Sequence, residues 1–178
     1  EAPVPVCSVQ RTSYAPGGSG NVANNIQSLG GVAHLVGVTG EDGTANNLLK
    51  TLGSLGLESE GLITDTSRST LLKSRVIAQK QQVVRVDRDS GSTITEDSLS
   101  KIKNVILKKI SQIKVIILSD YGKGTLSESL IEFVIQLGKK ESIPILVDPK
   151  GDDYSKYKGV YAITPNFKEF REAIGKTV

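Results

Sequence analysis

The sequence predicts an α/β fold with a mainly parallel central sheet, and two observations carry this prediction. Short β-rich segments alternate along the chain with segments whose apolar residues recur at helical spacing. Several predicted strands are followed at once by polar loops that contain glycine, which is typical of the ligand-binding edge of an open parallel sheet. Residues 71–87 break the alternation, because two β-rich runs follow each other there without a helix. We expect these runs to form a hairpin beside the main sheet.

The individual elements follow from short apolar runs and from capping signals. Strands are predicted at residues 4–9, 34–38, 71–78, 82–87, 115–119, 145–147 and 161–164. Helices are predicted over residues 22–29, 42–56, 96–110 and 126–139, and from residue 167 onwards. The predicted N-terminal caps are Asp42, Thr95, Thr125 with Glu128, and Asn166 with Glu169, and Gly56 is expected to end the second helix. The nearly all-apolar run 115–119 predicts a strand that is covered on both faces.

Composition narrows the class of protein. The chain has 178 residues, one cysteine and one histidine, so it has room for one domain but neither an intrachain disulfide nor a cluster of zinc ligands. We therefore expect a cytoplasmic protein. The net charge of +3 is small, and the basic stretch 101–114 is interleaved with apolar residues at helical spacing, so no nucleic-acid partner is expected. No apolar run is long enough to span a membrane, and residues 1–6 lack the pattern of a signal peptide.

A glycine-rich segment precedes the first predicted helix. Gly17, Gly18 and Gly20 would let a ligand approach the backbone closely, and Asn21 offers both hydrogen-bond donors and acceptors to a polyhydroxylated ligand. The alternative is a tight turn in which Asn21 is the N-cap of the helix.

Two further polar loops follow predicted strands. Asp120 and Lys123 come after the strand at 115–119, and Asp148 and Lys150 come after the strand at 145–147. Carboxyl ends of parallel strands share one edge of a sheet, so these side chains are expected to meet there, the carboxylate at sugar hydroxyls and the lysines at a phosphate. Each segment taken by itself could equally be an ordinary polar loop.

The last segment whose side chains could bind a ligand comprises Asn166, Phe167, Lys168 and Glu169. Its spacing is that of a capping box, which would give it a purely structural role. The functional alternative is that the Glu169 carboxylate orients water around Mg²⁺, which keeps several water ligands when it binds phosphates. On the predicted hairpin, Lys73 and Arg75 share one strand face and could hold a phosphate, or they could belong to a solvated charged face.

At this point the motifs resemble a known family. The spacing of Asn21, Ala23, Gly30 and Gly40 is similar to the first signature of the PfkB/ribokinase carbohydrate kinases, with Ser19 as a minor departure, and 166–169 resembles the family's N-x-x-E element. Several other segments resemble one branch, the D-glycero-β-D-manno-heptose 7-phosphate kinase domain of bifunctional heptose kinase/adenylyltransferases. These segments are residues 1–6, 70–87, 119–124, 148–151 and 164–166.

The resemblance implies a ribokinase-like three-layer α/β/α sandwich with a small β-lid, built from residues of about 3–10 and 70–88, the remainder of 1–178 forming the body. It implies that Gly17, Gly18 and Asn21 contact the sugar, and that residues 166–169 lie at ATP and, through water, at Mg²⁺. The enzyme would phosphorylate C1 of the heptose 7-phosphate, a precursor of ADP-heptose for lipopolysaccharide. From these expectations we assign Lys73, Arg75, Lys123 and Lys150 to the existing 7-phosphate. The lid is also the expected homodimer interface.

The family's catalytic aspartate lies in a Gly-Ala-Gly-Asp motif that residues 1–178 do not contain, and we expect this motif to lie beyond Val178. We therefore expect a kinase domain truncated at both ends and inactive as an isolated fragment, because phosphoryl transfer depends on the base and the anion hole. Two alternatives remain open. The chain could belong to another PfkB-type kinase, for ribose, fructose or a nucleoside, or it could be a non-catalytic sugar-binding or dimerisation module.

Overall fold

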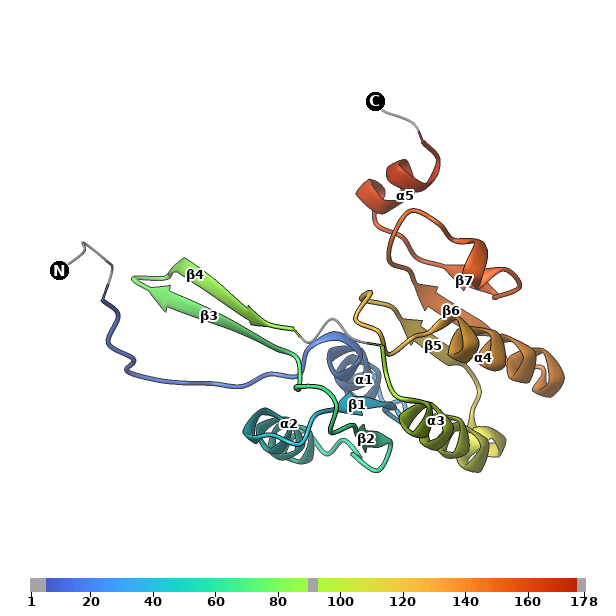
Figure 1. The fold of residues 1–178 in the computed structure, drawn as a ribbon, viewed down its shortest axis with the longest axis horizontal. Helices are drawn as coiled ribbons and strands as arrows, with labels where there is room; N and C mark the ends of the chain where they lie inside the picture. The colour runs from blue at the N-terminus through green and yellow to red at the C-terminus, as the bar shows by residue number, and fades with distance from the viewer. Residues whose placement is uncertain (1–5, 90–92, 176–178) are drawn as a thin grey trace.

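The computed structural model describes residues 6–89 and 93–175 and shows an α/β protein with a protruding hairpin (Figure 1). The strands are β1 Gly37–Thr39, β2 Leu62–Thr64, β3 Leu72–Ala78, β4 Gln81–Arg88, β5 Ile116–Ser119, β6 Ile145–Asp148 and β7 Ala162–Ile163. The helices are α1 Gly18–Ser28, α2 Gly43–Ser54, α3 Glu96–Lys109, α4 Glu128–Glu141 and α5 Phe167–Ala173. Two 3₁₀ turns, η1 and η2, span Ile110–Gln112 and Ser155–Tyr157.

The strands of the body pair in parallel, as the alternation of strands and helices predicts, but they form two separate sheets and not one central sheet. β1 pairs with β2, and β5, β6 and β7 form a second sheet in that order. The larger core lies where α3 and α4 pack on β5 and β6, and its most buried members include Ile102, Ile131 and Val147. A smaller core under α1 and α2 is centred on Leu52. Partly buried Val36, on the segment leading into β1, packs against the larger core and links the two parts.

The predicted hairpin is confirmed. β3 and β4 pair antiparallel, and they project away from both parallel sheets (Figure 1). The turn is made by Gln79 and Lys80, both with positive φ (49° and 65°), the backbone conformation that fits the twist of a two-residue hairpin loop. Every residue of β4 is exposed, so few tertiary contacts hold the hairpin in place.

Most of the predicted helix caps are confirmed, and one is wrong. Asp42 accepts from the Ala45 amide at 2.8 Å, and Thr95 accepts from the Ser98 amide at 3.2 Å. The Thr125–Glu128 capping box does not form, because α4 begins only at Glu128 and that residue therefore cannot occupy the third helical position. Ser127 is the actual cap, with Oγ accepting from the Leu130 amide at 3.3 Å.

Three other expectations need correction. Of the strand predicted at residues 4–9, residues 4 and 5 lie outside the described part, and residues 6–9 are irregular, with Val6 91% exposed and Val9 73% exposed. A lone extended segment is not stabilised without a paired neighbour, so of the two segments predicted for the lid only the hairpin has β-structure among the described residues. Asn21 is not an N-cap, because α1 already begins at Gly18. Ile117 of β5 is 38% exposed, so the described residues do not cover both faces of that strand.

The short strand β2 was not predicted at all. It is three residues long and lacks an alternating pattern, and its pairing with β1 is what makes it a strand.

Candidate functional site

The polar loops that follow β5 and β6 lie side by side. Ser119 and Asp148 are paired in the parallel register, and the Asp120 amide donates to the Asp148 carbonyl oxygen at 2.9 Å. The loop 120–124 therefore runs next to the loop 148–151. Gly122 has a φ of +63°, and a Cβ on it would lie 3.5 Å from Cγ of Lys150. The convergence of these loops, expected from the sheet edge, is what the structure shows.

Asp120 is a deeply buried charged side chain at this edge, 5% exposed, and both of its carboxylate oxygens accept hydrogen bonds. Oδ2 accepts from the Tyr157 hydroxyl at 2.5 Å and from Lys156 Nζ at 3.0 Å, and Oδ1 accepts from the Gly122 amide at 2.7 Å. Burial alone would raise the pKa of Asp120, but these hydrogen bonds together hold it below its ordinary value. The carboxylate is therefore charged and fastens the loop 120–124 to η2.

Lys150, in the loop 148–151, pairs with Glu169. Its Nζ is 3.1 Å from Glu169 Oε1, while Glu169 Oε2 accepts from the Asn166 amide at 3.1 Å. The Asn166 amide, followed by Lys150, lowers the pKa of Glu169. The neighbouring Asp148 has a raised pKa because it is partly buried and faces the Glu169 charge. The capping box predicted for Asn166 and Glu169 is present, with the Glu169 amide donating to Asn166 Oδ1 at 3.0 Å.

The glycine-rich start of α1 faces the loop after β5. Gly18 has a φ of +49°, and a Cβ there would meet the Tyr121 ring at 3.4 Å. A Cβ on Gly17 would meet nothing within 4 Å, so packing does not require glycine at that position. Asn21 is exposed on the first turn of α1.

A large open hollow extends from this edge toward the hairpin and separates the predicted site residues into two groups. Among its lining residues are Gly17, Gly18, Lys73, Arg75, Asp120 and Lys123. Lys123 Nζ is paired there with the Asp89 carboxylate. Asn21, Lys150 and the segment Asn166, Phe167, Lys168 and Glu169 are outside this lining. The four cations predicted to act together are thus divided, three at the hollow and Lys150 beside Glu169.

The position of the catalytic aspartate stays a prediction. The Gly-Ala-Gly-Asp motif is expected beyond Val178, and Val178 itself lies outside the described residues, which extend to Gly175. The described site therefore consists of groups that could bind and orient a substrate, and the assignment of a catalytic base is left to the expected motif.

Sequence reasoning missed several residues that shape the site. Lys156 and Tyr157, which hold Asp120, lie in a 3₁₀ turn and carry no motif that would have singled them out. Asp65 and Arg68, between β2 and β3, are buried at 3% and 7% exposure. A charged pair within a segment of Ser and Thr ordinarily indicates a surface loop. In the part of the chain that the structure describes, no group of three or more His, Cys, Asp or Glu side chains could hold a metal ion.

The parallel sheets and the polar loops at their carboxyl edge fit a ribokinase-like carbohydrate kinase domain, and comparison with known proteins gives the family. Residues 2–178 match the pfkB family of carbohydrate kinases, and the chain belongs to that family. "Bifunctional protein HldE" of Aliarcobacter butzleri (strain RM4018) is 46% identical over 173 residues, which is 97% of this chain and 36% of the relative. The protein of the same name from Helicobacter pylori (strain J99) is 43% identical over 174 residues, 98% of this chain and 38% of the relative. The chain thus spans little more than a third of these relatives.

Solved structures confirm the predicted ribokinase-like fold. Phosphofructokinase-2 from Escherichia coli, described as a tetrameric inhibited form, superposes with a TM-score of 0.72 at 20% identity, covering 99% of this chain and 58% of that one. A putative ribokinase from Agrobacterium tumefaciens gives a TM-score of 0.64 at 14% identity, with 99% and 57% covered. None of the helices in residues 6–89 and 93–175 has the length and apolar character needed to cross a bilayer.

Proposed function

We propose that the chain forms the sugar side and part of the nucleotide side of an ATP-dependent kinase that phosphorylates C1 of D-glycero-β-D-manno-heptose 7-phosphate. The resemblance of its motifs to that branch of the family supports the substrate, as does its identity of more than 40% to proteins named HldE. The observation that carries the proposal is the charge pattern of the hairpin face at the hollow.

That face carries more positive charge than its own residues balance. Arg75 of β3 lies directly opposite Arg85 of β4, and Lys73 lies opposite Asp87. Arg85 Nε is 3.0 Å from Asp87 Oδ1, so the one carboxylate of this set is already paired. Like charges placed directly across a sheet destabilise it. An anionic ligand such as a sugar phosphate would relieve this repulsion, and Lys73 and Arg75 line the hollow where it would enter.

The sugar itself would lie between the hairpin and the glycine-rich turn. Gly17 and Gly18 offer backbone without side chains, and Asn21 adds an exposed amide on the next turn. Lys123 would reach the ligand by leaving Asp89. Asp120 contributes by fixing the loop that carries Lys123, because both of its oxygens already have donors.

On the nucleotide side, the exposed residues Asn166, Phe167 and Lys168 would contact ATP, and Glu169 would orient water of a bound Mg²⁺. Mg²⁺ would supply charge neutralisation between the transferred and leaving phosphates. Lys150 fits this side better than the sugar 7-phosphate, because its ammonium group is held by Glu169 and lies outside the hollow. Glu169 and partly buried Asp148 supply the carboxylate chemistry that Mg²⁺ prefers.

The exposed hairpin would serve as a homodimer interface in the cytoplasm. Its exposed large apolar side chains are Ile77, Val83, Val84 and Val86, of which Ile77 also lines the hollow. An unpaired edge with exposed valines favours association with a second copy. Sedimentation of the natural-length protein with and without a Val84→Glu change would test this, since a dimer lost in the variant supports the interface.

The deciding experiment is a coupled ADP-release assay with the gene product that contains this chain at its natural length. We expect the heptose 7-phosphate to be the best substrate of a panel that also contains ribose, fructose and nucleosides. A clear preference for one of the other sugars would replace the heptose proposal, and sugar binding without ADP release would favour a non-catalytic module.

A further inference from the structure

The segment between β2 and β3 contains three buried polar side chains within six residues. Asp65, Arg68 and Thr70 are 3%, 7% and 4% exposed, although the segment lies between two strands and would ordinarily be a surface loop. Two residues beyond Thr70 the hairpin begins at Leu72. We call residues 65–70 the polar hub, because its side chains fasten three separate parts of the body.

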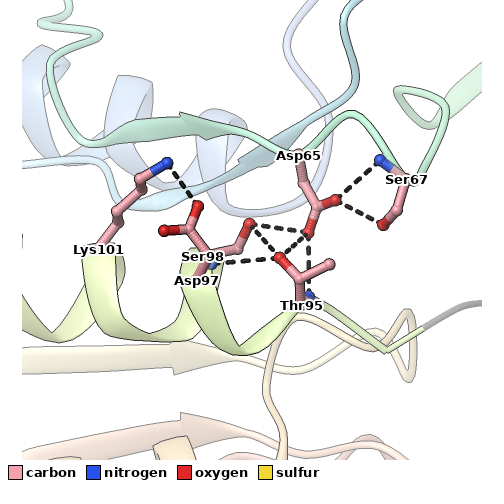
Figure 2. A network of polar contacts seen from close by, with 6 residues as sticks. All are labelled: Asp65, Ser67, Thr95, Asp97, Ser98 and Lys101. Carbon is pink, nitrogen blue, oxygen red and sulfur yellow. Dashed lines mark hydrogen bonds and ion pairs between the residues drawn. The ribbon is translucent and has the colours of Figure 1, made fainter.

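Asp65 fastens the hub to the start of α3. Its Oδ2 accepts from the Thr95 amide and hydroxyl, both at 3.0 Å, and from the Ser98 hydroxyl at 2.8 Å (Figure 2). Oδ1 accepts from the amide and hydroxyl of Ser67 at 3.0 and 2.5 Å. α3 follows the second strand of the hairpin, so this one carboxylate holds the chain on both sides of the hairpin.

Thr70 fastens the hub to the loop between β1 and α2. Its hydroxyl accepts from the Gly40 amide at 2.8 Å, and its own amide donates to Asp42 Oδ2 at 2.8 Å. The approach is so close that a Cβ on Gly40 would lie 2.3 Å from the Arg68 carbonyl oxygen. Only glycine fits at position 40, which gives a physical reason for a residue of the family signature.

Arg68 is the member of the hub that reaches the candidate site. Its Nη2 donates to the backbone carbonyl oxygen of Lys123 at 3.0 Å, while its Nη1 is buried and has no hydrogen-bond partner among the described residues. A buried guanidinium with an unmade hydrogen bond is costly to retain, and a neutral side chain would serve a merely structural contact at lower cost. The contact is to the loop 120–124, and Lys123 of that loop lines the hollow.

We propose that Arg68 is a positioning residue that fixes the loop 120–124, and with it the Lys123 ammonium group, relative to the base of the hairpin. Arg68 touches no ligand in this role. It sets the distance between Lys123 on the loop and Lys73 and Arg75 on the hairpin, so that the three cations can reach one phosphate. The phosphate ligand in this inference rests on the proposed function. The role of Arg68 in fixing the loop does not depend on that function.

The test compares Arg68→Met, Arg68→Lys and Thr70→Val in the natural-length protein. Thr70→Val is the matched control, since it also removes a buried hydrogen bond of the hub but makes no contact with the loop. We expect Arg68→Met to raise the KM for the sugar phosphate about tenfold, the equivalent of one charged hydrogen bond, and to leave the KM for ATP within about twofold. Arg68→Lys should recover part of the loss, and Thr70→Val should lower the melting temperature without moving either KM.

A second measurement does not depend on activity. Amide hydrogen exchange in a peptide covering residues 120–124 should become about tenfold faster in Arg68→Met and stay at the wild-type rate in Thr70→Val. Unchanged exchange in Arg68→Met overturns the proposal whatever the enzyme does. Faster exchange without any sugar kinase activity in the wild type would keep the positioning role and reject the proposed function. Equal KM increases in Arg68→Met and Thr70→Val would also overturn the positioning role of Arg68, because they would reflect general loosening of the hub.

Discussion

The polar hub and the hairpin follow each other along the chain, carry similar residues and have opposite environments. In the hub, Asp65 and Arg68 are almost completely buried and each makes contacts with a distant segment. In the hairpin, Lys73 and Arg75 are exposed and face a hollow. Charged side chains in the first region fasten segments of the body to one another, whereas those in the second are exposed, and we propose that they bind a ligand. Burial, rather than residue type, separates the structural role of the hub from the binding role that we propose for the hairpin.

The largest expected effect that tests this contrast is on stability at Asp65. Asp65→Ala removes an acceptor for five donors and leaves the buried Ser98 hydroxyl without its acceptor. We expect a loss of about 3 kcal/mol in the free energy of unfolding, measured by urea denaturation. The matched control is Asp97→Ala on the same helix, which removes an exposed pair with Lys101 at 2.5 Å and one acidic charge of the first helical turn, and should cost less than about 1 kcal/mol (Figure 2). Equal losses would contradict the contrast.

The next effect is on the stability of the fold at acid pH. Hydrogen bonds, first of all from Ser67, hold the pKa of Asp65 far below its ordinary value in the folded protein. The unfolded chain therefore binds this proton at a higher pH than the folded chain does, so the stabilisation is present above about pH 4 and is lost as the pH falls below it. Urea denaturation at pH 6 and pH 3 should show a steeper loss in the wild type than in Asp65→Asn. Parallel losses would show that Asp65 is not the group responsible.

On the hairpin, the expected effect is on binding and not on folding. The double change Lys73→Met and Arg75→Met should raise the KM for the sugar phosphate more than about tenfold, because two charge-assisted contacts to phosphate are lost. The unfolding free energy should change by less than about 0.5 kcal/mol, as is usual for exposed side chains. Lys101→Met, on an exposed face of α3, is the control and should leave KM unchanged. A fall in stability with an unchanged KM would reverse the roles assigned to the two regions.

The smallest effect lies at the tip of the hairpin. Lys80 has a φ of +65°, a conformation that glycine adopts without steric cost. Lys80→Gly should stabilise the hairpin by about 0.5 kcal/mol, with Lys158→Gly, at a negative φ of −56°, as a destabilising comparison. Thermal unfolding of both variants measures the difference, and a destabilised Lys80→Gly would show that the turn does not need a left-handed residue.

Prediction from sequence worked best where the information is local. The hairpin and the caps Asp42, Thr95 and Asn166 depend on residues within a few positions of each other. Prediction failed where two nearby residues could both cap a helix, because Ser127 and not Thr125 is the N-cap of α4. It also failed for β2, which is a strand only because β1 lies beside it.

The sequence by itself determined the family, most of the helices and strands, and the set of polar loops that gather at one sheet edge. Only the tertiary structure decided how those residues are used. It placed Lys150 with Glu169 rather than with Lys73 and Arg75, occupied both oxygens of Asp120, and buried Arg68 against the Lys123 loop. The physical reason is that hydrogen bonds across 19 to 55 residues depend on how the elements pack, and no local pattern records that packing.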